Sequence, residues 1–157
     1  MEQVTNTNTN TDVEIVEADN ALVAAFSNPT GNALYCSRKI ESMADKAALY
    51  NAINSPDVQI SDHVNQVIVM QDVIVQQVQV SRRDAAGRET GEVATAPRVT
   101  IVDVEGHTYS CVSVGIYNAL RNLCSIFGAP SWPDGLPVVV RQINRGSNRI
   151  LTLDAAL

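Results

Sequence analysis

The chain has 157 residues, enough for one domain with an appended segment and too few for a second full hydrophobic core. Hydrophobic residues make up 45% of it, as in a globular protein, and no run of about 18 apolar residues exists that would span a membrane. The formal net charge of −6 excludes a chain that is basic overall, which is the usual composition of a nucleic-acid binder.

The acidic residues are concentrated at the front of the chain. Residues 1–37 hold five acids and no base, whereas residues 65–157 hold eight of each.

The N-terminus has neither the basic start nor the apolar segment of a secretory signal, so we expect a cytoplasmic protein. Three widely spaced cysteines fit neither a disulfide framework nor a zinc site and are interpreted as free thiols: Cys36, Cys111 and Cys124.

Residues 1–64 are predicted to form a tail and a partly helical extension. Residues 1–12 are rich in Asn and Thr and too polar to bury, so we expect a disordered tail. Residues 13–64 form the extension, in which an acidic stretch, an apolar run and a turn precede "ALYCS", which fits a short strand.

A helix is predicted over 43–53, near the end of this extension. Ser42 and Asp45 fit a capping box at its start. Apolar residues recur on one side of it, and Pro56 ends it. That apolar side is formed by Ala47, Tyr50 and Ile53.

From residue 65 onward the pattern predicts β-structure. "QVIVMQDVIVQQVQVSR" is one long strand, in which Val73 and Val75 place the apolar face on odd positions and Val78 and Val80 on even ones. Side chains alternate strictly along a strand, so this change predicts a bulge or sharp bend within it. The stretch 82–96, with two glycines and three arginines, is predicted to be a flexible loop.

Five further elements follow this loop. "PRVTIVDV" and "HTYSCVSV" are predicted to form a hairpin around Glu105-Gly106. A helix follows, with Ser113 as its cap, an apolar stripe from Ile116 to Phe127, and Gly128 at its end. The strands "LPVVVRQIN" and "RILTLDA" are joined by the turn "RGSN".

Five strands with one helix between the third and fourth is the order of an OB-fold, a small Greek-key barrel. We therefore predict an all-β, five-stranded OB barrel over residues 65–157, with the partly helical extension in front of it. OB-folds bind oligonucleotides or oligosaccharides on the face of strands 2–3 and with the loops joining strands 1–2 and 4–5. A five-stranded SH3-like barrel is the main alternative, although it usually lacks a full three-turn helix at that point.

The basic residues gather where such a barrel would bind its ligand. Seven of the eight bases after residue 64 lie on or beside this surface, and all are arginine, which forks onto phosphate and stacks on bases. The alternative for each is an arginine that is merely solvated in a loop. The predicted contacts are Arg82 and Arg83 in the first loop, Arg98 at the start of strand 2, and Arg141, Arg145 and Arg149 around the second loop.

Aromatic residues are scarce for a protein that stacks on bases, since the chain has only seven. Tyr109, on strand 3, is the predicted stacking residue, with core packing an equal alternative. Tyr117 lies off the apolar stripe of the helix, which indicates an exposed ring. Trp132 is expected to cap the bottom of the barrel rather than to touch DNA.

No catalytic or cofactor motif is present. "GHTYSCVSVG" lacks the spacing and the lysine of a phosphate-binding loop, and nothing places a nucleophile on an elbow. His63 and His107, the only histidines, are the sole support for a small hydrolase, and Asp103 with Glu105 lacks a further metal ligand. We therefore expect no catalysis, no cofactor and no metal.

Five stretches are distinctive: "DKAALYNAINSPD", "ISDHVNQVI", "TGEVATAPRVTIVDVEGHTYSCVSVGIYNALRNL", "FGAPSWPDG" and "ILTLD". Through them the block from about Leu49 to Leu153 resembles the single-stranded-DNA-binding proteins of phages and mobile elements of Gram-positive bacteria. The resemblance implies an OB-fold that coats single-stranded DNA without sequence preference during replication or recombination of the element, in a bacterial host cell. It supports Arg98, Arg141, Arg145 and Arg149 but gives no support to Arg82 and Arg83, whose loop varies in length.

Partners other than DNA stay open at this point. The tail "LTLDAAL" lacks the acidic run with a terminal Phe by which bacterial single-strand binders recruit replication and recombination proteins. The net acidity and the few aromatic rings favour a second interpretation, a protein-interaction module for which DNA contact is incidental. We also expect a homo-oligomer, because small barrels often associate through strand edges and the long first strand offers one.

Overall fold

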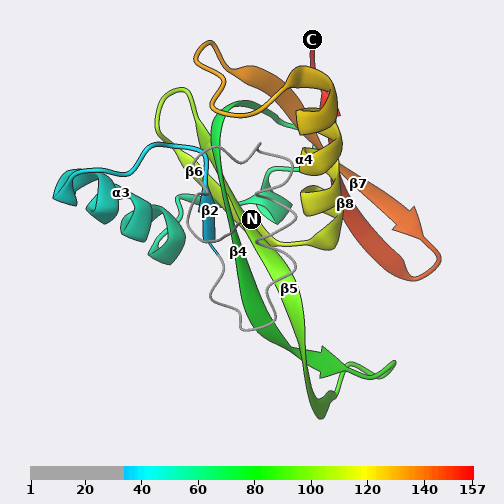
Figure 1. The fold of residues 1–157 in the computed structure, drawn as a ribbon. Helices are drawn as coiled ribbons and strands as arrows, with labels where there is room; N and C mark the ends of the chain where they lie inside the picture. Colours follow the sequence, from blue (N-terminus) through cyan, green and yellow to red (C-terminus); the bar gives the residue numbers. More distant parts are fainter. Residues whose placement is uncertain (1–33) are drawn as a thin grey trace, which may run out of the picture.

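The computed structural model describes residues 34–157, and one curled sheet runs through them (Figure 1). The tail, apolar run and turn predicted within residues 1–33 lie outside the described residues. The strand order is β3-β6-β5-β4-β7-β8, and β2 pairs with β4. The strands are β2 (Leu34–Cys36), β3 (Val58–Gln59), β4 (Val67–Arg83), β5 (Glu89–Asp103), β6 (Thr108–Val112), β7 (Leu136–Arg145) and β8 (Asn148–Ala155).

Two α-helices and a short 3₁₀ turn accompany this sheet. Helix α3 (Met43–Asn54) precedes the turn at Ile60–Asp62, and α4 (Val114–Phe127) lies between β6 and β7 in the chain. The predicted capping box is present in α3, since the Ser42 hydroxyl accepts from Asp45 N and Asp45 Oδ2 accepts from Ser42 N, both at 3.0 Å. No helix of residues 34–157 is long and apolar enough to cross a membrane.

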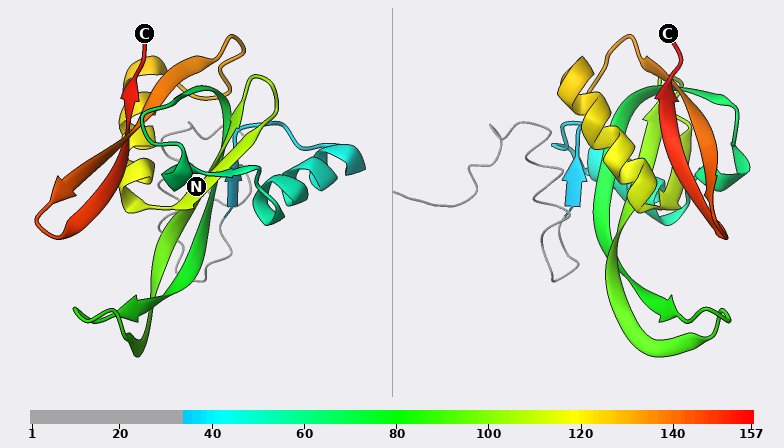
Figure 2. Two further views of the ribbon diagram at one scale, coloured as in Figure 1. Left: turned by 180° about the vertical axis from the view of Figure 1, so that it is seen from behind. Right: turned by 90° about the vertical axis from the view of Figure 1, so that its right-hand side faces the viewer.

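The sheet confirms a mostly β, OB-like fold and differs from the prediction in its strand count and closure. Strands β4 to β8 are the five predicted strands, with α4 between the third and fourth. In the described residues β6 and β8 do not pair, so the sheet is a curled half-barrel, and α4 packs along β8 and β5 (Figure 2). Strands β2 and β3, from the predicted extension, join the same sheet. The predicted boundary at residue 64 stays a prediction.

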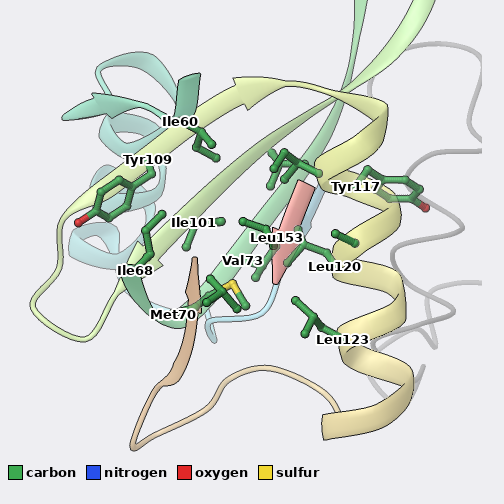
Figure 3. Packing of buried hydrophobic residues seen from close by; sticks show 14 of the residues in the cluster. Ile60, Ile68, Met70, Val73, Ile101, Tyr109, Tyr117, Leu120, Leu123 and Leu153 are labelled. Carbon is green, nitrogen blue, oxygen red and sulfur yellow. The ribbon is translucent and has the colours of Figure 1, made fainter. Parts of the chain in front are cut away.

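The core lies between the concave side of the sheet and helix α4 (Figure 3). The stripe predicted on α4 is buried over its first three turns, through Leu123, whereas Ile126 is 77% exposed and Phe127 39% exposed. The prediction for these last two residues was wrong. The opposite error concerns Tyr117, which was expected to be exposed. Its ring is only 1% exposed, because the buried side of α4 is wide enough to include it.

The predicted irregularity of β4 exists at another position. The register with β5 is unbroken from Asp72 to Ser81, so no bulge separates Val75 from Val78. The register shifts instead between Met70 and Asp72. This shift moves the core face from even positions before it to odd positions after it. At this shift the carbonyl of Gln71 accepts a hydrogen bond from Trp132 N at 3.0 Å.

The flexible loop predicted over 82–96 is mostly strand. Strand β5 begins at Glu89 and pairs with Arg83, leaving a turn of five residues at the tip of a long twisted hairpin. Asp84 caps this turn, since its Oδ1 accepts from Ala86 N at 2.9 Å and from Arg88 N at 3.0 Å. Alternating Thr, Val and Ala residues after Gly91 continue the pairing of β5 with β4. The prediction of a loop gave more weight to the glycines and arginines than to this alternation.

The long strand β4 was expected to offer an exposed edge for association, but both its edges are paired over part of their length. β4 pairs with β5 on one side, and on the other with β7 over Val67–Met70 and with β2 over 74–76. Within the described part of the chain, residues 77–83 are the longest stretch of β4 without a strand partner on the side away from β5. A homo-oligomer stays a prediction.

Helix α3 projects from one side of the sheet (Figure 1) and touches it through a few residues. Leu49 and Ala52 share a hollow of about 20 Å³ with Ile74 and Val102 of these strands. None of the residues of α3 is fully buried, so the helix rests on the sheet with one partly covered side. The segment that precedes the helix is attached to the sheet by an ion pair, in which Arg38 Nη2 lies 3.2 Å from Oδ2 of the buried Asp72.

Candidate nucleic-acid interface

Two hollows adjoin on the outer face of the molecule, and Val112 lines both. We call the first the Arg98 hollow, which has about 240 Å³, and the second the Arg149 hollow, which has about 500 Å³. We refer to the two hollows together as the groove. The Arg98 hollow is lined by Ile53, Asn54, Pro56, Gln59, Arg98, Ser110, Cys111 and Val112, and the Arg149 hollow by Val112, Ser113, Val114, Gly115, Asn118, Arg149, Ile150 and Leu151.

Arg98 reaches the groove because of the alternation along β5. Val99 and Ile101 are fully buried on the core side, so Arg98 lies on the outer side, directly opposite Val112 of β6. No carboxylate of residues 34–157 forms an ion pair with Arg98. Its guanidinium is therefore available for phosphate.

Neutral side chains surround this guanidinium. Ser110 and Gln59 come from the parallel pair of β6 and β3. Burial raises the pKa of the Cys111 thiol to about 12, so it is uncharged at neutral pH. Val112, 44% exposed, leaves an apolar surface at the junction of the two hollows. A backbone phosphate near Arg98 would therefore meet no negative charge from these neighbours.

The start of α4 forms one wall of the Arg149 hollow. The Ser113 hydroxyl caps the helix by accepting from Ile116 N at 3.1 Å, as predicted. Gly115 follows, and a Cβ on it would collide with the carbonyl oxygen of Leu151 in β8. The first N–H groups of a helix and its dipole favour anions, so this wall and Arg149 both favour negative charge.

The β7–β8 hairpin separates the arginines that were predicted to act together. Arg141 and Arg145 lie on the same face of β7 by alternation, whereas Arg149 pairs with Asn144 and lies on the opposite face. Arg141 is also engaged, since its Nε lies 3.3 Å from Oδ2 of Asp154 and its Nη1 donates to Asn65 at 3.1 Å. Only Arg149 of these three lines the groove.

Arg82 and Arg83 lie near the tip of the β4–β5 hairpin, outside the residues that line the groove. Arg83 Nη2 lies 3.5 Å from Glu89, and its Nη1 donates to the Gly87 carbonyl at 2.8 Å. Arg82 has no ion pair in the described part of the chain. This hairpin and the β7–β8 hairpin project toward the same end of the molecule (Figure 2), as the two binding loops of an OB-fold do.

The predicted stacking residue Tyr109 is part of the core, which was the alternative. Its ring is 8% exposed and lies 5.1 Å, centroid to centroid, from the ring of His63. Its hydroxyl donates to Asp103 Oδ2 at 2.8 Å. Burial, together with this hydrogen bond, raises the pKa of Tyr109 to about 12. Trp132 packs against the core, as expected.

The most exposed aromatic ring of residues 34–157 belongs to Tyr50, at 62%. The sequence placed Tyr50 on the apolar side of the predicted helix, so its role at the surface was missed. The sequence did contain a sign that Tyr50 is exposed, because a Lys four residues before it and an Asn four residues after it share its helical face.

A third potential metal ligand joins the two acids considered in the sequence. Asp103, Glu105 and His107 each offer an atom within 4.8 Å of the others. Asp103 is occupied, however, because its Oδ1 accepts from Glu105 N and His107 N at 2.9 Å each. Although burial raises the pKa of Asp103, hydrogen bonds from Tyr109 and these backbone groups lower it more. The trio is explained as the cap of the β5–β6 turn.

Comparison with known families supplies the context for this groove. The model of a family described as phage single-stranded DNA-binding protein matches residues 31–156, which include the whole sheet, both helices and both hollows. Comparison with curated proteins and with solved structures gives no significant match. The family match confirms the resemblance noted in the sequence and covers most of the chain. The protein belongs to the phage single-stranded DNA-binding protein family.

Proposed function

We propose that the protein binds single-stranded DNA along the groove, without sequence preference and without catalysing a reaction. The observation that carries this proposal is the meeting of two hollows at Val112, each holding an arginine with no ion pair in residues 34–157. Both arginines would contact phosphates, which are the same at every nucleotide. Protection of DNA during replication or recombination of a phage or mobile element, in the cytoplasm of its bacterial host, is the role we propose.

Charge neutralisation in the structure favours some of the predicted arginines over others. Arg83 and Arg141 already face carboxylates at 3.5 Å and 3.3 Å. A phosphate would have to displace these carboxylates, whereas Arg98 and Arg149 have no such competitor in the described residues. We propose Arg98 and Arg149 as the central contacts, and Arg82 and Arg145 as outer contacts at the two hairpins.

The test is a titration of a fluorescently labelled 30-nucleotide oligo-dT at two salt concentrations. The Arg98→Ala/Arg149→Ala variant should bind much more weakly than the parent protein. The matched control, Arg83→Ala/Arg141→Ala, removes the same charge and should bind close to the parent. Equal weakening by both variants would show that total charge, and not the groove, determines binding. A parent protein that does not bind the oligonucleotide would favour the protein-interaction module instead.

We propose in addition that the protein forms a homo-oligomer, supported by the edge of β4 over residues 77–83, which has no strand partner among residues 34–157. Two such hairpins can pair edge to edge, as exposed strand edges do in other proteins. Light scattering of the parent protein should then give a mass above 16.9 kDa. A Gln79→Pro substitution on this edge should lower that mass, because the backbone N–H of Gln79 faces away from β5. A monomeric parent would contradict the proposal.

A further inference from the structure

Helix α3 presents an aromatic ring and a lysine on the side that borders the groove. Ile53 and Asn54 of this helix line the Arg98 hollow. Tyr50 precedes them by three and four residues, and Lys46 precedes Tyr50 by four, so all of them are neighbours on one helical face. An adjacent side of the helix, with Leu49 and Ala52, shares a hollow with Ile74 of β4 and Val102 of β5.

The Tyr50 ring is open to solvent. It is 62% exposed, whereas Tyr109 and Tyr117 are buried at 8% and 1%. A single exposed ring is common on a protein surface. Its significance lies in its position one helical turn from the residues that share a hollow with Arg98. Lys46 is exposed too and forms no ion pair with a described residue.

We infer that α3 is a wall of the DNA groove, in which Tyr50 stacks on a base and Lys46 contacts a phosphate. The inference rests on the proposed function and assigns it two further contact residues. A strand whose phosphate lies at Arg98 would have its neighbouring bases beside α3. Stacking on a tyrosine ring accepts any base, which agrees with binding that ignores sequence.

Affinity measurements on α3 variants test this wall. Tyr50→Ala should weaken oligo-dT binding by about 5- to 150-fold, the range for loss of one stacked base, and Tyr50→Phe should stay near the parent. Lys46→Gln should reduce the dependence of log K on log salt by about 0.7, the value for one single-strand phosphate, and Tyr50→Ala should leave that slope unchanged. Asn51→Ala, on the same helix but lining a hollow on its other side, is the control.

A direct signal comes from Tyr50→Trp. Saturation with oligo-dT should quench the fluorescence of this variant well beyond any change shown by Trp132 in the parent. Thermal unfolding of each variant should match the parent, because these side chains are exposed. Parent-like affinity of Tyr50→Ala without extra quenching in Tyr50→Trp would overturn the inference, and weakening by Arg98→Ala in the same series would leave the proposed function standing. Absence of binding by the parent would overturn both.

Discussion

Gly115 of helix α4 lies directly against the carbonyl oxygen of Leu151 in strand β8. This contact sets the distance between the start of the helix and the edge of the half-barrel, and therefore the width of the Arg149 hollow, which both residues line. The backbone of Gly115 is not in the left-handed region, so a glycine is needed here because there is no room for a side chain, and not because of its backbone conformation.

Gly115→Ala should destabilise the protein by about 1–3 kcal/mol, because the added methyl group overpacks a contact with backbone. In an open helical position the same change would stabilise the protein by up to about 1 kcal/mol. The sign of the change in unfolding free energy therefore shows whether Gly115 is in close contact with β8. Urea unfolding of the variant measures it. Asn122→Ala, exposed on the same helix, should change stability by less than about 0.5 kcal/mol. A Gly115→Ala protein as stable as the parent would show that α4 and β8 move apart freely.

Arg98→Ala/Arg149→Ala should reduce the steepness of the salt dependence of oligo-dT binding by about 1.4, since each single-strand phosphate contact contributes about 0.7. The physical cause is that fewer counterions are released from the DNA. Titrations at four or more salt concentrations give this slope. An unchanged slope with weaker binding would mean that the two arginines position the groove without touching phosphate.

Arg38→Ala should destabilise the protein by about 1–3 kcal/mol, because it leaves the buried carboxylate of Asp72 without its charged partner. The Ser37 hydroxyl, which donates to Asp72 Oδ1 at 2.9 Å, compensates only in part. Chemical unfolding monitored by circular dichroism measures the loss. Lys39→Ala breaks an exposed pair with Glu41 and should change stability by less than about 1 kcal/mol. A similar small effect in both variants would contradict a structural role for Arg38.

Asp103 should contribute a component of stability that is lost in acid. Its pKa is lowered in the folded protein despite burial, by hydrogen bonds from Tyr109 and from backbone N–H groups. The contribution is therefore complete above the ordinary pKa of about 4 and disappears as the pH falls through the lower folded value. Asp103→Asn should lack this component, so the difference in Tm between parent and variant should shrink from pH 6 to pH 2. A constant difference would contradict the shift.

The helix caps of this protein depend on residues a few positions apart, and the sequence alone predicted them. Ser42 with Asp45 caps α3, Ser113 begins α4 and Gly128 ends it, as expected. Caps involve neighbours in the chain, so their physical causes are visible in the letters. The position of the bulge in β4 and the strand over 89–96 depend on how β4 pairs with β5, and the sequence did not predict them. The family resemblance, carried by the same stretches, was confirmed as well.

The composition of the groove was decided by the tertiary structure. Arg141 and Arg149 are equally basic in the sequence, yet one faces Asp154 and the other lines a hollow with α4. Tyr50 and Tyr117 both lie on helices, yet only the first is open to solvent. Burial and pairing arise from elements that are distant in the chain and meet only when the sheet curls, so no local pattern encodes them.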